Sequence, residues 1–332
     1  MNSVTTRVIR LRSVYSPHKI SKYLQTKGLR TSSTTWLKYL QEEQKKQYED
    51  DGYTIAKNLL SEEEVDEGRK ALHQLIERGR SITDQEKVIY EFGEGHCYDE
   101  PRIHRVRFPS QQHQTFDHFM KHPKLLDCIE DLIGPSFRYI AQDKLNVKPA
   151  GHGAAIRWHQ DWAFFPHTND SVLTASVLLH DVTRENGCLQ IIAGSHKGPV
   201  LTHLAENETR FANSVTDPNF KPTNIRYLEA PAGSVTFHHV RVVHGSARNV
   251  SDKPRSVLCY IYNAMDAWPL LGVGDERFLN IGRLDFDAFD RTRLRGERCV
   301  RPRLADVPVE LPVPFVESSV FQAPSDIPEP EP

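Results

Sequence analysis

Residues 158 to 162 read Trp158-His159-Gln160-Asp161-Trp162. In an extended strand alternate side chains project from the same face, so we expect His159 and Asp161 to point the same way. An imidazole and a carboxylate two positions apart can bind adjacent positions on one divalent metal ion. One further ligand would complete the two-histidine, one-carboxylate triad of non-haem Fe(II) sites, which leaves positions open for substrates. The competing interpretation is an incidental surface pair, because His-x-Asp is short and recurs by chance.

A hydrophobic period of about two surrounds this motif, beginning at Phe137. The expected strands are residues 139–147, 154–158, 172–179, 189–192, 234–238 and 256–262. Turn signals at Asn169-Asp170, Asn186-Gly187 and Ala232-Gly233 separate several of them. Many short strands without intervening helices predict a sandwich or barrel rather than a parallel sheet.

Helical signals lie upstream of the strands. Ser61 and Glu64 form a capping box at the start of a predicted helix, whose buried stripe is Val65, Leu72, Leu75 and Ile76. A second helix is expected from Pro123 to the residue before Gly134. The predicted fold class is therefore mainly β with supporting α-helices.

The composition is that of a globular protein of 332 residues, with 38% hydrophobic and 26% charged residues. No apolar run approaches the length of a membrane span. Eight of the 42 basic residues and none of the 44 acidic residues lie in residues 1–41, so the remainder has a net charge of about −10. An acidic body argues against a general nucleic-acid binder.

The five cysteines are scattered, odd in number and form no Cys-x-x-Cys pair. This usage suits a reducing compartment and argues against a disulfide framework or a cysteine zinc site.

The chain divides into three predicted parts. Residues 1–41 are a basic, Ser- and Thr-rich extension, typical of a mitochondrial transit peptide if the source is eukaryotic. The alternative is a disordered basic tail, and a bacterial source would make the protein cytoplasmic. Residues 48–300 are expected to form a single domain. Residues 301–332 hold eight of the 21 prolines and are expected to be an extended tail that at most wraps this domain.

His244 is the candidate third ligand, although His238 and His239 lie nearby. An apolar run leads into His244, and Gly245 after it allows close backbone approach. Arg255 follows eleven residues later. The spacing predicts a turn at residues 251–254 and a return on an adjacent antiparallel strand, which would bring Arg255 to the metal pocket.

An arginine within an apolar strand is costly unless it meets an anion, and its planar fork suits a carboxylate. The alternative for Arg255 is a salt bridge at the sheet edge. Gln142 and Lys144 share one face of an expected strand with Asn146. Both are candidates for contact with a cosubstrate, and structural polar residues of the sheet are an equally good interpretation.

Together, His159-Gln160-Asp161, His244-Gly245-Ser246 and Arg255 resemble the phytanoyl-CoA dioxygenase family of Fe(II)/2-oxoglutarate oxygenases. The resemblance covers most of residues 50–265. It includes Asp51-Gly52-Tyr53, the block Glu185-Asn186-Gly187-Cys188-Leu189 and the stretch from Ala193 to Lys197. The family usually has proline where this chain has Ala193, a departure that concerns loop geometry rather than chemistry.

The resemblance implies a double-stranded β-helix, the jelly-roll or cupin-like fold. Fe(II) would be held by His159, Asp161 and His244, and the cosubstrates would be 2-oxoglutarate and O2. Arg255 would pair with the distal carboxylate of 2-oxoglutarate, and Ser246 could add a hydrogen bond. Halogenating relatives have a small residue in place of Asp161, so a carboxylate favours hydroxylation.

The expected activity is hydroxylation of a small or lipid-like organic substrate with release of succinate and CO2. An acyl-CoA is one candidate, since Arg102, Arg105 and Arg107 could meet its phosphates. The rival hypotheses are a catalytically silent metal-binding β-helix protein with a scaffolding or regulatory role, and a zinc hydrolase. Expected partners are a small-molecule substrate, with no nucleic acid and no membrane span, and the oligomeric state stays open.

Overall fold

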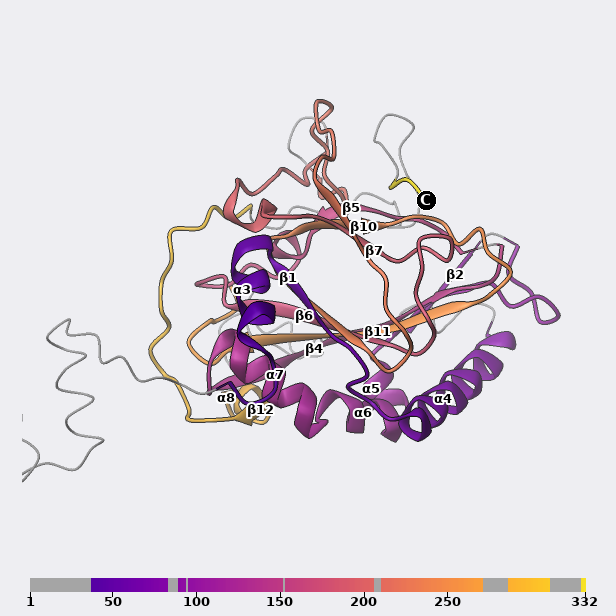
Figure 1. Ribbon diagram of the computed structural model, residues 1–332, viewed down its shortest axis with the longest axis horizontal. Coiled ribbons are helices and arrows are strands. Elements are labelled where there is room, and N and C mark those ends of the chain that lie inside the picture. The colour runs from indigo at the N-terminus through magenta and orange to yellow at the C-terminus, as the bar shows by residue number, and fades with distance from the viewer. Residues whose placement is uncertain are drawn as a thin grey trace, which may run out of the picture. The chain divides into compact units, whose positions relative to one another are not determined.

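The computed structural model describes residues 37–82, 89–93, 95–151, 153–205, 210–270, 286–310 and 330–332. Of the two units into which the chain splits, the second, residues 38–332, is described below (Figure 1). Almost all of the predicted basic extension lies outside the described residues. The second unit contains every helix and strand given below.

Two antiparallel sheets form this unit. The large sheet has the order β1 (Tyr53–Ala56), β9 (Val235–His239), β6 (Val172–Leu178), β11 (Arg255–Ala264), β4 (Phe137–Lys148), β3 (Ile103–Arg107) and β2 (Tyr90–Phe92), with β12 (Arg293–Arg295) also paired to β4. The small sheet has the order β5 (Ile156–Gln160), β10 (Val243–Ser246), β7 (Leu189–Ile192) and β8 (Ile225–Leu228). This arrangement confirms the predicted mainly-β fold, a double-stranded β-helix with supporting helices.

Helices line the side of the large sheet that faces away from the small one (Figure 1). The helices on this side are α4 (Glu62–Arg80), α5 (Pro109–Gln112), α6 (Gln114–Met120) and α7 (Pro123–Ile133). The remaining elements are α3 (Glu42–Asp51), which lies beside β1, α8 (Phe286–Asp290), and the short 3-10 turns η1 (Asp161–Ala163) and η2 (Ser195–Lys197). Ser61 and Glu64 make the predicted capping box at the start of α4. Within the described residues, no helix is long and apolar enough to cross a membrane.

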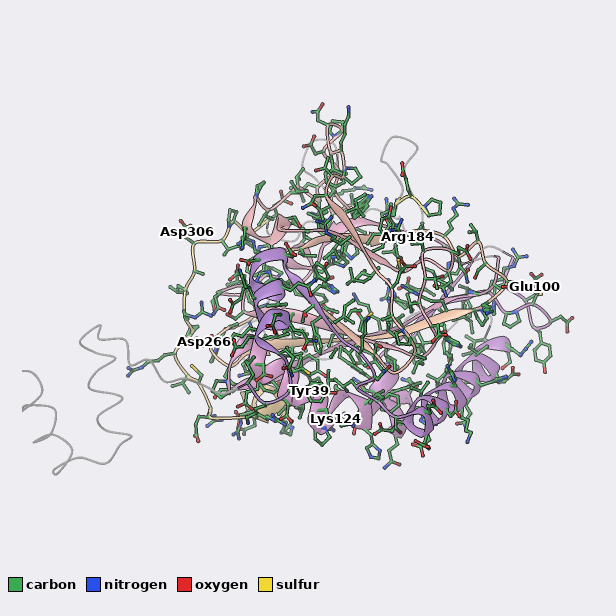
Figure 2. All side chains as sticks on the ribbon, viewed as in Figure 1. Tyr39, Glu100, Lys124, Arg184, Asp266 and Asp306 are labelled. Atoms are coloured by element: carbon green, nitrogen blue, oxygen red, sulfur yellow. The ribbon has the colours of Figure 1, made fainter. Side chains whose placement is uncertain are left out.

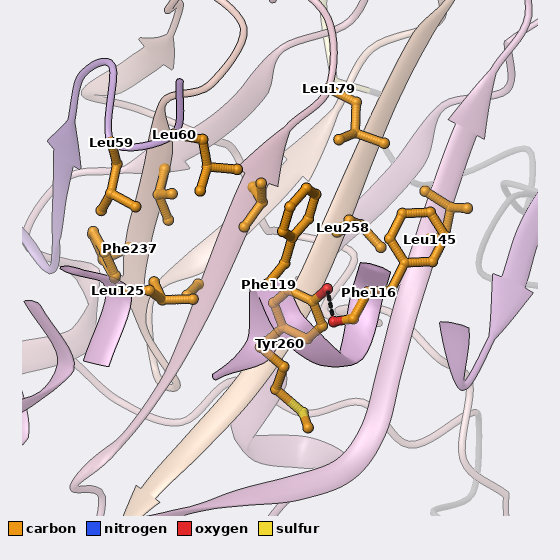
Figure 3. Packing of buried hydrophobic residues seen from close by; sticks show 14 of the residues in the cluster. Leu59, Leu60, Phe116, Phe119, Leu125, Leu145, Leu179, Phe237, Leu258 and Tyr260 are labelled. Atoms are coloured by element: carbon orange, nitrogen blue, oxygen red, sulfur yellow. Dashed lines mark hydrogen bonds between the residues drawn. The ribbon is translucent and has the colours of Figure 1, made fainter. Parts of the chain in front are cut away.

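The main hydrophobic core lies between these helices and the large sheet. Leu145 of β4, Leu258 and Tyr260 of β11, and Phe116 and Phe119 of α6 all belong to it (Figure 3). Side chains alternate along a strand, so the residues between them face the small sheet. That inner face carries the polar residues described below, together with apolar ones such as Val257 and Ile261. Elsewhere charged side chains such as Glu100, Lys124 and Arg184 are exposed (Figure 2).

Two expectations about the strands need correction. The strand of the opening motif runs over Ile156–Gln160 instead of residues 154–158, so Asp161 lies beyond its end, in η1. The chain does not return from His244 on an adjacent strand. β10 pairs with β5 and β7, whereas β11 pairs with β4 and β6 in the other sheet. A jelly roll alternates between its sheets, so residues 247–254 cross from one sheet to the other.

The folded unit also begins before residue 48. Backbone N–H groups of Lys38, Tyr39 and Leu40 donate hydrogen bonds to the Asp131 carboxylate of α7. In the C-terminal tail the described residues contact the unit. The Trp162 indole donates to the Pro308 carbonyl at 2.8 Å, and Gln190 donates to the Glu331 carbonyl. The division into residues 1–41, 48–300 and 301–332 otherwise stays a prediction.

Candidate active site

Three buried side chains converge between the two sheets. His159 on β5 and His244 on β10 are directly paired in the small sheet, and Asp161 follows β5 in η1. One ligand atom from each lies within 4.8 Å of the other two. The Asp161 Oδ1 atom is 3.7 Å from His159 Nε2 and 3.9 Å from His244 Nε2. These separations suit three ligands around one ion rather than direct hydrogen bonds.

Backbone carbonyls fix both imidazole rings. His159 Nδ1 lies 2.8 Å from the Arg157 carbonyl, and His244 Nδ1 lies 3.0 Å from the Val242 carbonyl. A carbonyl only accepts, so each Nδ1 carries the proton and each Nε2 keeps its lone pair. This is the orientation that metal-binding histidines receive from their hydrogen-bond partners.

Asp161 is held through its other carboxylate oxygen. Its Oδ2 accepts hydrogen bonds from Thr174 Oγ1 at 2.7 Å and from His238 Nε2 at 3.2 Å. Both donors come from the inner face of the large sheet, on β6 and β9. They leave Oδ1 directed at the two histidines. His238, a rival candidate for the third ligand, is therefore a hydrogen-bond partner of Asp161, and His239 instead faces Asp170.

The protonation states match those of metal ligands. Burial lowers the pKa of His159 well below its usual value, with a further contribution from His244. Burial lowers the pKa of His244 to about 4. For Asp161, burial alone raises the pKa, but the imidazoles of His244, His238 and His159 overcome that effect and hold it well below normal. Neutral histidines and an ionised carboxylate are the forms that bind a metal ion.

Arg255 begins β11 on the inner face of the opposite sheet. The residue is buried, at 4% exposure, and its Nε atom has no hydrogen-bond partner within the described parts of the chain. Burial lowers its pKa, without any carboxylate beside it among the described residues to compensate. An orphaned buried guanidinium of this kind fits an anionic ligand such as a carboxylate.

Lys148 of β4 is the direct cross-strand partner of Arg255. Its Nζ donates to Ser246 Oγ at 2.7 Å and also to the Ala247 carbonyl. Burial, with the neighbouring Arg255 charge, lowers the Lys148 pKa well below its usual value. Ser246 accepts from Lys148 and keeps its own hydroxyl proton for another acceptor. Arg255, Lys148 and Ser246 thus form a second polar centre, with hydrogen-bond donors and no acid.

The two remaining candidates lie differently. Gln142 is exposed on β4, and no contact joins it to either centre among the described residues. Lys144 is half-buried, and its Nζ lies 5.9 Å from the centre of the Phe164 ring. That ring is in turn 5.8 Å from the His159 ring. Roles for Gln142 and Lys144 in binding the cosubstrate stay predictions.

Sequence reasoning missed Lys148 and Thr174. Lys148 follows Gln142, Lys144 and Asn146 on the same face of β4, so the two-residue period alone could have added it. Thr174 has no such signal, because it lies within an apolar strand. Trp158 and Trp162 are buried core residues, whereas Phe164 lies beside His159.

The predicted arginine row is split by the structure. Arg105 and Arg107 lie on β3 and share the carboxylate of Glu91. Arg102 precedes the strand and pairs with Glu100.

Comparison with known proteins decides the family. The phytanoyl-CoA dioxygenase (PhyH) family profile matches residues 48–257. The chain belongs to the phytanoyl-CoA dioxygenase family. It is 33% identical over 277 residues to a probable alpha-ketoglutarate-dependent hypophosphite dioxygenase of Stutzerimonas stutzeri, a match that covers 82% of this chain and 92% of that protein. It is 28% identical over 244 residues to the ectoine dioxygenase of Bordetella parapertussis, covering 68% and 76%.

Among solved structures, the non-heme alpha-ketoglutarate-dependent carbocyclase SnoK from nogalamycin biosynthesis is similar to this chain. The TM-score is 0.59 at 28% identity, with 74% of this chain and 92% of that one covered. The phytanoyl-CoA dioxygenase family member described here is therefore an iron- and 2-oxoglutarate-dependent dioxygenase. Iron, 2-oxoglutarate and O2 are its cofactor and cosubstrates.

Proposed function

We propose that His159, Asp161 and His244 hold Fe(II), and that the dioxygenase hydroxylates a small organic molecule. The observation that carries the proposal is the buried triad, in which each ligand atom is oriented by a partner on its far side. When bound, the iron supplies oxygen activation coupled to decarboxylation of 2-oxoglutarate to succinate and CO2.

Arg255 binds the distal carboxylate of 2-oxoglutarate in this proposal, with Ser246 and Lys148 beside it. The guanidinium offers two parallel N–H donors, and the Ser246 hydroxyl offers a third. The support is the buried Arg255 Nε without a partner and the absence of a counter-charge next to it among the described residues. Lys148 orients Ser246 through its 2.7 Å hydrogen bond.

Hydroxylation is the favoured outcome because Asp161 is a carboxylate that Thr174 and His238 hold in place. It occupies a coordination position that halide would need in a halogenating enzyme. The aromatic ring of Phe164 and the buried surroundings of His159 limit water at the site.

The prime substrate class is open to direct test. Similar proteins are named for hypophosphite and for ectoine, and the family for an acyl-CoA. Each is a candidate for this chain, and a screen that follows succinate formation or O2 uptake separates them.

Anaerobic titration of Fe(II) with 2-oxoglutarate tests the proposed site. Wild-type protein should develop the visible metal-to-ligand charge-transfer band of an iron-bound 2-oxo acid. His244→Ala should lose the band, and Arg255→Met should need a higher 2-oxoglutarate concentration to develop it. His73→Ala, an exposed histidine on α4, is the matched control and should keep the wild-type titration.

Activity assays on the same proteins separate the rival functions. Protein that binds Fe(II) and 2-oxoglutarate but forms no succinate with any substrate would support the silent scaffold. Zinc-dependent hydrolysis that survives Arg255→Met would support a zinc hydrolase, since that chemistry leaves Arg255 and Ser246 without a task.

We also infer a location from residues 1–41. Their basic, acid-free composition favours mitochondrial import in a eukaryotic source and has no such meaning in a bacterial one, where the cytoplasm is expected. Fusing residues 1–41 to a fluorescent reporter in eukaryotic cells tests this inference, because a diffuse signal would contradict it.

A further inference from the structure

The inner face of the large sheet carries three cationic side chains on β3 and β4. These two strands are separated from β6 and β9 by β11. Arg107 of β3 pairs in register with Lys144 of β4, and Arg105 pairs with Asn146. Lys144 is in turn opposite Cys259 of β11, which is opposite Ser176 of β6. The cations therefore share the surface that carries Thr174 and Arg255.

One carboxylate, that of Glu91, lies among these cations. Its Oε1 atom is 3.3 Å from Arg105 Nη1 and 2.8 Å from Arg107 Nε. Arg105 Nε also donates to Asn146 Oδ1 at 2.9 Å, so its guanidinium is fixed in place. Lys144 forms no ion pair with any carboxylate in the described parts of the chain. Its ammonium group instead faces the rings of Phe164 and Phe165, at 5.9 and 5.3 Å from their centres.

Lys144 also lies close to the metal-binding triad. Phe164, which it faces, packs edge-on against His159 with 5.8 Å between ring centres. The Arg255 and Lys148 centre is farther along the sheet, since four residues of one strand span about 13 Å. The distal carboxylate of 2-oxoglutarate at Arg255 is therefore too far away to pair with Lys144.

Positive charge remains after iron and cosubstrate are counted. Asp161 and the iron-binding carboxylate of 2-oxoglutarate together neutralise a divalent ion, and Arg255 takes the other carboxylate. Arg105, Arg107 and Lys144 all act on the single carboxylate of Glu91, and together they lower its pKa although burial raises it. Cations that are partly removed from water in this way are stabilised when an anion binds between them.

We propose that the prime substrate carries a compact anionic group, a carboxylate or a phosphorus oxyanion, which Lys144 and Arg105 bind beside the iron. The inference rests on the proposed function, because it places the substrate next to the triad. The side chain of Arg105 is 11% exposed and that of Arg107 is 45% exposed. A small anion inside the pocket can reach Arg105, whereas a bulky phosphate group held at the surface can meet only Arg107.

The test uses the full chain loaded with Fe(II) and 2-oxoglutarate without oxygen. Short carboxylates, phosphite and methylphosphonate are added in turn, each beside a neutral amide or alcohol of similar size. The visible band of the complex reports binding, and succinate formation in air reports turnover. We expect at least one anion to perturb the band and its neutral counterpart not to. The responding class identifies the group as a carboxylate or a phosphorus oxyanion.

Lys144→Met then assigns the contact. This change keeps most of the length of the side chain and removes its charge. We expect the dissociation constant of the responding anion to rise about tenfold or more, with the 2-oxoglutarate dissociation constant within about twofold of wild type. Lys144→Arg should restore most of the anion affinity. Lys121→Met removes an exposed lysine paired with Asp117 and should behave as wild type.

Several results would overturn the inference. One is a normal band in the wild-type protein that responds to no anion. Another is an anion affinity that Lys144→Met leaves unchanged. The third is a loss of 2-oxoglutarate affinity in Lys144→Met as large as its loss of anion affinity, which would make Lys144 a cosubstrate residue. A missing band in the wild-type protein is a different failure, since it would overturn the proposed iron site and the inference with it. Arg105 is not used as a test variant because its burial against Glu91 makes misfolding a competing explanation.

Discussion

Thr174 shows how one hydroxyl prepares a metal ligand. Its 2.7 Å hydrogen bond to Asp161 Oδ2 fixes the rotation of the carboxylate, so that Oδ1 faces His159 and His244. Thr174→Val keeps the shape of the side chain and removes the donor. We expect Fe(II) affinity to fall about 10- to 100-fold, as it does when partners of metal ligands are removed. Anaerobic Fe(II) titration measures the change.

Thr54→Val is the matched control for that prediction. Thr54 is also buried on a strand of the large sheet, but its hydroxyl donates to Gln47 instead of a metal ligand. Its Fe(II) affinity should equal that of wild type. Equal affinity losses in both variants would show that Thr174 acts through general packing.

Replacing Arg255 should change protein stability and 2-oxoglutarate affinity in opposite directions. The buried Arg255 side chain has no ion pair with a described carboxylate and its Nε is unpartnered there, so Arg255→Met should raise the free energy of unfolding by about 1–3 kcal/mol. The same change should weaken 2-oxoglutarate binding by about 100-fold, because the bidentate carboxylate contact is lost. Urea unfolding without ligands measures the first effect, and the charge-transfer band measures the second. A variant that is less stable and binds normally would contradict the assigned role.

Sequence alone predicts the site residues whose side-chain types are uncommon in their surroundings. Histidine, aspartate and arginine are uncommon beside apolar residues, so His159, Asp161, His244 and Arg255 could be selected from their neighbours in the chain. Thr174 could not, since threonine is common in strands and its partner is 13 residues away across a sheet. Lys148 is intermediate between predictable and unpredictable residues, because its role becomes apparent only when it is known to lie opposite Arg255.

At the scale of elements, β11 joins the site to the helical layer. Its inner side chains include Arg255. On its outer side Tyr260 donates a hydrogen bond to the Phe116 carbonyl of α6 (Figure 3), and Tyr262 donates one to the Met120 carbonyl of the same helix. Tyr260→Phe should lower the free energy of unfolding by about 1–2 kcal/mol, since a buried carbonyl loses its donor. Urea denaturation measures this loss. Turnover at saturating substrate should stay at the wild-type value, because the hydroxyl points away from the iron.

Element types are easier to predict than their pairing. The capping box of α4 and the turn residues that precede β6 and β7, Asn169-Asp170 and Asn186-Gly187, act over a few residues, so they are visible in the sequence. The partner of β11 is set by the crossing of residues 247–254 between sheets, which no local pattern records. The strand β5 runs two residues past its predicted end and stops at Gln160, because Asp161 enters a 3-10 turn in which the backbone N–H groups of Phe164 and Phe165 donate to its carbonyl.

At the scale of the whole molecule, buried neutral histidines make stability depend on pH. Burial lowers the pKa values of His167 and His203 to about 4, whereas an unfolded histidine titrates near 6.5. Between these values the unfolded chain binds more protons, so stability rises with pH and falls as the pH drops from about 6.5 towards 4. Each histidine contributes a slope of up to about 1.4 kcal/mol per pH unit.

Urea unfolding of the metal-free protein at pH 7, 6 and 5 checks this dependence. His167→Gln lies outside the proposed iron site and should reduce the slope below pH 6.5. A slope unchanged from wild type would mean that His167 is not neutral in the folded protein.

His244 and Arg255 are close in the chain but stand on opposite sheets. A cosubstrate bound to the iron at one end and to Arg255 at the other therefore links the two sheets for as long as it is bound. Amide hydrogen exchange in β5, β10 and β11 should slow together when Fe(II) and 2-oxoglutarate are both present, and by less with Fe(II) alone. At a 2-oxoglutarate concentration 100 times its dissociation constant, the added stability should be about 2.7 kcal/mol. Such an enzyme would be loosest when its cosubstrate is scarce, so its lifetime in the cell would follow the supply of 2-oxoglutarate.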